Sequence, residues 1–168
     1  MATRRRRLPG SGAPGAVRDV VAQGERVIAW ALDGNGDPVA VSTLALYLPT
    51  PSGVHDRLEF DRIASAGWAE DVMTVTMVGA GGRRHRVHLQ QPGEVPPAVR
   101  ERVTASIALS EHVSLGPGAG ARITARRLPG GDELTWNVVF DPGLDPADPQ
   151  LRSRAESAIT RLRSSTGL

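Results

Sequence analysis

The first half of the chain shows short segments in which apolar and polar residues alternate. Ile28, Trp30 and Leu32 share one face of the segment 27–32, and Leu58 and Phe60 alternate with charged residues over 57–61. Alternation of period two is typical of strands, and Gly, Pro, Asp and Asn between the segments favour turns. The pattern predicts six strands, at 27–32, 39–48 (two strands or one long bent strand), 57–61, 72–78 and 83–89.

The second half adds two predicted helices and a hairpin. Val99, Val103 and Ile107 repeat at helical spacing behind Pro96 and Pro97, which predicts a helix ending near Leu109. The segments 121–126 and 133–140 predict a hairpin across a Pro-Gly-Gly-Asp turn. A last helix begins near Asp145-Pro146 or Asp148-Pro149, and its apolar side chains are Leu151, Ala155, Ala158, Ile159 and Leu162.

These elements predict an α+β protein with a bent antiparallel sheet or partly open barrel, one internal helix and one C-terminal helix. Residues 1–16 are basic and rich in Pro and Gly, and we expect them to form a disordered arm. Residues 17–168 are then a single domain, which suits a chain of 168 residues.

The amino-acid composition excludes several classes of catalytic mechanism. All 20 basic residues are arginine, so every mechanism that needs a lysine is excluded. The chain has no cysteine, which excludes disulfides and thiolate nucleophiles and favours a cytoplasmic protein. The net charge is only +2, and the positive excess lies at the N-terminus. We find no secretory signal and no apolar stretch that could span a bilayer.

The densest charged feature is the run Arg4, Arg5, Arg6 and Arg7. Guanidinium groups on a flexible arm can contact phosphates of nucleic acid or anionic lipid. Arg83, Arg84 and Arg86 can extend such a patch, so these seven arginines are the candidate anion-binding residues. The alternative is a solubilising extension with no ligand.

Other motifs favour structural interpretations. Asp33-x-Asn35-x-Asp37 resembles the start of a calcium loop, but the required Gly and Glu positions hold Pro38 and Leu44, so a hairpin turn is expected. His85 and His88 lie three apart on a predicted strand and should face opposite sides. The Gly-rich turns lack the spacing of a dinucleotide site. We therefore predict no catalytic residues, no metal and no cofactor.

Three stretches, 24–30, 45–48 and 58–68, resemble the opening of bacterial pleckstrin-homology-like (PH-like) and GRAM-like domains. They read Gly-Glu-Arg-Val-Ile-Ala-Trp, Ala-Leu-Tyr-Leu and Leu-Glu-Phe-Asp-Arg-Ile-Ala-Ser-Ala-Gly-Trp. The chain from about 24 to 165 is also similar to a group of uncharacterised small proteins of GC-rich bacteria. Such a domain has seven strands and one closing helix, and here either helix can fill that place. The resemblance implies a PH-like barrel but identifies no site, and the acidic turn at 33–37 is unsuited to lipid headgroups.

We therefore expect a non-enzymatic binding or scaffolding module that recognises a protein partner or associates with itself. One alternative is a small-ligand binder or an enzyme whose pocket brings the histidines or Glu59 and Asp61 together. Another alternative is binding to nucleic acid or an anionic membrane through the N-terminal arm. The two alternatives predict different sites, one inside the sheet and one in the arm.

Overall fold

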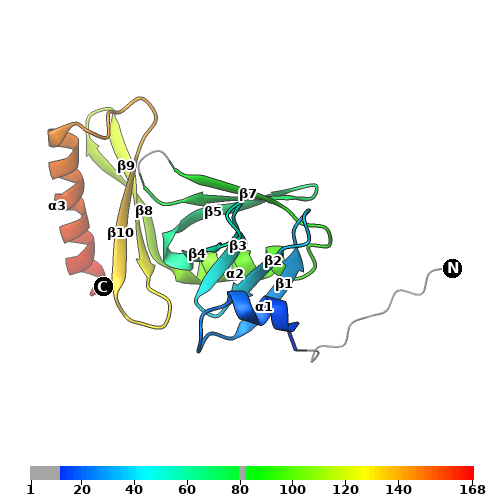
Figure 1. Cartoon of the computed structure of the whole chain (residues 1–168). Helices are drawn as coiled ribbons and strands as arrows, with labels where there is room; N and C mark the ends of the chain where they lie inside the picture. Colours follow the sequence, from blue (N-terminus) through cyan, green and yellow to red (C-terminus); the bar gives the residue numbers. More distant parts are fainter. Residues whose placement is uncertain (1–11, 80–81) are drawn as a thin grey trace.

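The computed structural model describes residues 12–79 and 82–168. It is an α+β structure with three antiparallel sheets that do not close into a barrel, and within each sheet the strands pair in sequence order. The first sheet contains β1 (Val27–Leu32), β2 (Pro38–Ser42), β3 (Ala45–Pro49) and β4 (His55–Glu59). The predicted class is therefore confirmed (Figure 1).

The second sheet contains β5 (Ile63–Ala69), β6 (Val72–Met77) and β7 (Arg84–His88). A single 3-10 turn, η1 (Phe60–Arg62), leads into it from β4. The first two sheets enclose the largest hydrophobic cluster, and the helix α2 (Val95–Ser106) contributes Val95, Val99 and Val103 to it. In the described part of the chain, seven strands therefore precede α2, four in the first sheet and three in the second.

The third sheet is separate and carries its own helix. It contains β8 (Ile107–Gly116), β9 (Ala119–Arg127) and β10 (Leu134–Phe140), and α3 (Pro149–Thr166) covers the face turned away from the first two sheets (Figure 1). Asp148 caps α3 by accepting from the amides of Gln150 and Leu151, as the Asp-Pro start predicts. The predicted apolar face of α3 packs on this sheet.

Two strands differ from the prediction. The sequence pattern did not give β5, and the helix predicted to reach Leu109 ends at Ser106, where β8 begins without a loop. Ile107 continues the helical spacing of Val99 and Val103, yet it lies in β8 and is 38% exposed. The helix ends earlier because the following residues pair with β9.

The N-terminal segment packs on the outer face of the first sheet. The short helix α1 (Gly15–Val20) buries Val17 against Ala40, Ala45 and Tyr47. The boundary predicted after residue 16 therefore falls within α1. One domain over 17–168 stays a prediction. The first two sheets and α2 surround one hydrophobic cluster, and the third sheet and α3 surround another.

Candidate ligand-binding cleft

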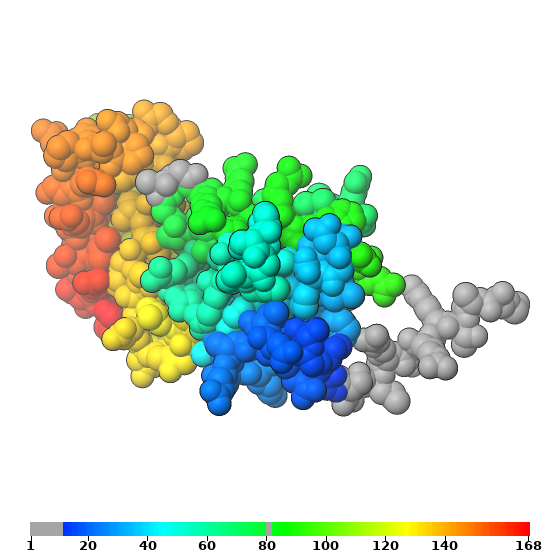
Figure 2. Space-filling view, in the orientation of Figure 1, coloured from blue at the N-terminus to red at the C-terminus, as the bar shows by residue number. Residues whose placement is uncertain are grey.

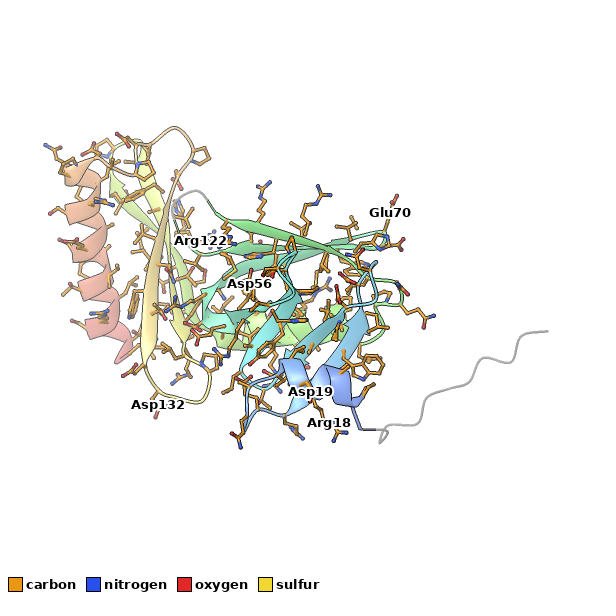
Figure 3. The ribbon with its side chains drawn as sticks, in the orientation of Figure 1. Arg18, Asp19, Asp56, Glu70, Arg122 and Asp132 are labelled. Atoms are coloured by element: carbon orange, nitrogen blue, oxygen red, sulfur yellow. The ribbon has the colours of Figure 1, made fainter. Side chains whose placement is uncertain are left out.

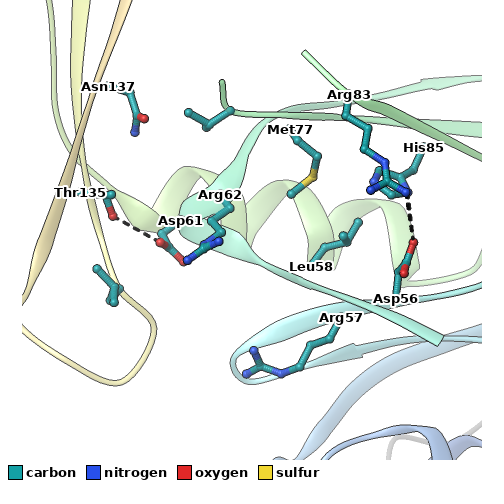
Figure 4. Close-up of a pocket in the computed structure, with 12 residues that line it drawn as sticks. Asp56, Arg57, Leu58, Asp61, Arg62, Met77, Arg83, His85, Thr135 and Asn137 are labelled. Carbon is teal, nitrogen blue, oxygen red and sulfur yellow. Dashed lines mark hydrogen bonds and ion pairs between the residues drawn. The ribbon is translucent and has the colours of Figure 1, made fainter. Parts of the chain in front are cut away.

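A cleft of about 650 Å³ opens where the first two sheets part, beside the third sheet. Such volumes are typical of small-molecule sites, which favour junctions between structural units. Charged and polar side chains lie at its two ends, with apolar side chains between them (Figure 4). The cleft is lined by Asp56, Arg57, Leu58, Asp61, Arg62, Met77, Val78, Arg83, His85, Leu128, Thr135 and Asn137.

One end of the cleft is formed by a buried carboxylate. Asp61, in η1, is only 3% exposed, and its Oδ2 accepts a hydrogen bond of 3.3 Å from Thr135 Oγ1 on β10. Within 12–79 and 82–168, its Oδ1 is buried without a hydrogen-bond partner. A buried polar atom left unpaired costs free energy, so packing alone does not explain this position.

Arg126, beneath this end, does not neutralise Asp61 directly. Its guanidinium donates to the Val103 and Ala64 carbonyls and to Ser106 Oγ. Burial lowers the pKa of Arg126, and the Asp61 charge opposes that shift without cancelling it. Asp61 therefore lines the cleft with a carboxylate whose Oδ1 has no hydrogen-bond partner among the described residues.

The other end combines Asp56 of β4 with Arg83 and His85. Asp56 Oδ2 lies 3.9 Å from Arg83 Nη2 and 3.8 Å from His85 Nδ1. Burial lowers the pKa of His85, the Arg83 charge lowers it further, and Asp56 opposes both. At neutral pH this end therefore presents a neutral imidazole beside a loosely paired arginine and aspartate.

The labelled side chains in the middle of the cleft include the apolar Leu58 and Met77 (Figure 4). Arg57 also contributes to the lining, but its guanidinium bonds Glu25, Glu59 and Tyr47 and belongs to a structural network. The arrangement fits an elongated ligand with an apolar centre and polar groups at both ends.

The structure separates the arginines that the sequence grouped together. Arg83 lies in the cleft, whereas Arg84 and Arg86 are exposed on the opposite face of β7. The run Arg4, Arg5, Arg6 and Arg7 lies outside the described residues. A continuous patch through all seven arginines stays a prediction, and the described three do not share one face.

The expected convergence of histidines or of Glu59 with Asp61 is only partly seen. Asp61 and His85 line the cleft, but Glu59 pairs with Arg57 and Arg62. The other histidines have separate partners. His55 bonds the Pro38 carbonyl, His88 lies near Asp71, and His112 pairs with Asp141.

The described part of the chain holds no group of three or more His, Asp or Glu side chains placed for a metal ion. In the calcium-like turn, Asp33 Oδ1 accepts from the amides of Asn35 and Asp37, both at 2.8 Å. Its side chain thus closes the β1–β2 hairpin, as the turn interpretation predicts.

Sequence reasoning did not single out Asp56, Thr135 or Asn137. Thr135 and Asn137 occupy the polar positions of the alternating strand β10, a signal that indicates a non-core face. A solvent-exposed face and a face lining a cleft give the same alternation, so the pattern alone could not separate them. The side chain of Arg122, another polar residue in an alternating strand, points from β9 toward the first two sheets (Figure 3).

No protein-family model, curated protein or solved structure matches the chain. Across the residues that the structure describes, no helix is both long and apolar enough to cross a bilayer.

Proposed function

We propose that this protein is a non-enzymatic binding module, built on a PH-like domain, whose ligand occupies the cleft that opens between the first two sheets beside the third sheet. The observation that carries the proposal is the buried Asp61 carboxylate, whose Oδ1 has no partner within the described chain, at one end of that cleft. Proteins rarely retain an unsatisfied buried oxygen without a role for it.

The element order supports the PH-like part of the proposal. The resemblance implies seven strands and a closing helix, and β1–β7 are followed by α2, whose Val95 and Val99 are fully buried between the sheets. The part from β8 to α3 is then an addition to that domain. It contributes Thr135 and Asn137 to the cleft, which the seven strands alone would leave more open.

The two ends of the cleft indicate the class of ligand. Asp61 Oδ1 suits a hydrogen-bond donor such as an amine or amide, whereas Arg83 and neutral His85 suit an acceptor such as a carboxylate or carbonyl. The apolar centre favours a hydrocarbon or aromatic body between these groups. The ligand class is therefore a small molecule with a donor at one end and an acceptor at the other.

A fragment screen on the full chain tests the proposal. The probe is a library of low-mass compounds that carry one amine and one carboxylate, observed by the methyl signal of Met77 and the side-chain amide of Asn137. We expect selected fragments to shift both signals. Met77→Trp fills the middle of the cleft and should abolish those shifts.

Val139→Trp is the matched control, because Val139 is 67% exposed on β10 and does not line the cleft. It adds the same side chain and should leave fragment binding unchanged. Fragments that shift no cleft signal, or that bind Met77→Trp as well as the original protein, would contradict the proposal.

A further inference from the structure

The outer edge of β7 carries main-chain groups without a strand partner in the described chain. In the antiparallel ladder with β6, Met77 N donates to Arg83 O and Leu89 N donates to Asp71 O. Hydrogen-bonded pairs recur at every second residue, so 85 and 87 also bond β6. The amides and carbonyls of Arg84 and Arg86 therefore point away from β6, toward the open edge.

At its far end, this edge already pairs with the end of β1 and the turn that follows it. Gly34 N donates to His88 O and Gln90 N donates to Leu32 O, both at 3.0 Å, and Asp33 bridges Leu89. The main chain at 88–90, at and just beyond the end of β7, thus hydrogen-bonds to residues 32–34. The described contacts stop there and leave Arg84 and Arg86 open along the same edge.

The side chains beside this open edge are positively charged. Arg84 and Arg86 are exposed on the outer face, and no acidic group of the described residues pairs with either. Residues two apart on a strand lie about 6.6 Å apart, so the two guanidinium groups match alternate side chains of a second strand. In Figure 2, green side chains project from the upper rim of the molecule, where β7 lies.

We propose that the edge of β7 at Arg84–Arg86 binds an extended acidic segment of a partner protein by strand addition. The main chain of that segment would pair with the outward amides and carbonyls, and its alternate Glu or Asp side chains would face the two arginines. This surface is separate from the cleft, so the proposal does not depend on a ligand there.

Charge complementarity argues for an acidic protein strand over the other occupants. A nucleic acid would satisfy the guanidinium groups but would leave the row of main-chain donors and acceptors without matching partners. A second copy of this edge would place arginine opposite arginine, which is unfavourable. An acidic strand satisfies both the charges and the main chain.

Titration of the full chain with a designed peptide tests the proposal. The probe is an acetylated and amidated peptide, Thr-Glu-Val-Glu-Val-Glu-Thr, observed by the backbone amide signals of 84–88. We expect saturable shifts and slowed hydrogen exchange at Arg84 and Arg86. Replacing both arginines with glutamate should weaken binding at least tenfold, whereas Arg100→Glu, an exposed arginine of α2, should leave it unchanged.

Arg86→Pro separates strand addition from simple charge attraction. Proline removes an amide that points away from β6, so the ladder with β6 should survive. We expect this variant to lose peptide binding, and an N-methylated form of the peptide should fail to bind the unaltered protein. Equal binding by the N-methylated peptide, tighter binding of a single-stranded oligonucleotide at the same arginines, or no binding at all would overturn the proposal.

Discussion

The Arg126 guanidinium donates a hydrogen bond of 2.9 Å to Ser106 Oγ, which joins the middle strand of the third sheet to the last residue of α2. The same side chain also bonds the Val103 and Ala64 carbonyls and is 5% exposed. One arginine therefore connects α2, β5 and β9. A second contact joins the third sheet to η1, because Thr135 Oγ1 on β10 donates to Asp61 Oδ2.

Replacing Arg126 with alanine should destabilise the protein by about 2–4 kcal/mol, because three acceptors lose a buried donor and a cavity forms. Chemical denaturation followed by circular dichroism measures the change. Arg122→Ala, an exposed arginine four residues earlier on the same strand, should change stability by less than about 0.5 kcal/mol. Equal effects of the two substitutions would show that Arg126 does not hold the sheets together.

Glu25 should make the protein more stable at neutral than at acidic pH. Burial raises the pKa of Glu25, but hydrogen bonds from Ser42 and Arg57 outweigh burial and hold it below its ordinary value of 4.5. The folded state thus binds this proton less tightly than the unfolded state. The stabilisation is complete above that ordinary value and is lost as the pH falls through the lower folded pKa.

Urea unfolding at several pH values tests this expectation. Glu25→Gln should lower stability at pH 7 by about 1–2 kcal/mol and flatten the loss of stability below pH 5. Glu101→Gln, an exposed residue of α2, is the control and should retain the original pH dependence. The interpretation fails if Glu25→Gln keeps the full acid sensitivity.

The pKa of His85 should respond in opposite directions to its two charged neighbours. Arg83→Ala removes a positive charge and should raise this pKa toward the ordinary value of 6.5, whereas Asp56→Asn should lower it further. Titration of the imidazole Cε1 proton by NMR measures both shifts. An unchanged pKa in both variants would mean that the cleft end is not arranged as described.

Gly120→Ala should cost about 0.5–1 kcal/mol of stability, because it forces apart a half-exposed ion pair. A Cβ at this position would lie 2.5 Å from Asp141 Oδ2 and 2.7 Å from His112 Cε1, so the His112–Asp141 pair must move. In a background with both partners replaced by alanine, the same substitution should cost nothing measurable. Gly67→Ala is the control, because a Cβ there meets no atom within 4 Å.

Local signals in the sequence predicted most elements of this fold. Alternation and turn residues located β1, β4, β6 and β10, and the Asp-Pro start located α3. The strand β5 was missed because Ala64, Ser65, Ala66 and Gly67 have little preference for strands. These residues form a strand because they pair with β6, and the pattern of residues within 64–67 does not indicate that pairing.

The site was harder to predict than the fold. Asp61 and Glu59 lie two positions apart, and nothing local in the sequence distinguishes Asp61, which is buried, from Glu59, which pairs at the surface. The hydrogen-bond partner of Asp61, Thr135, lies 74 positions later in the chain. Likewise, the large side chains Ile28 and Leu32 of β1 lie exposed, while Ala29 and Ala31 fill the core beneath α2.

All strand pairings within the three sheets join neighbours in the chain, in the orders β1 to β4, β5 to β7 and β8 to β10. Each sheet can therefore form by closing short loops, which carries a small entropic cost compared with pairing remote segments. We expect folding to be fast for a protein this rich in strands. During synthesis, β1–β7 and α2 can assemble before the residues of the third sheet have left the ribosome.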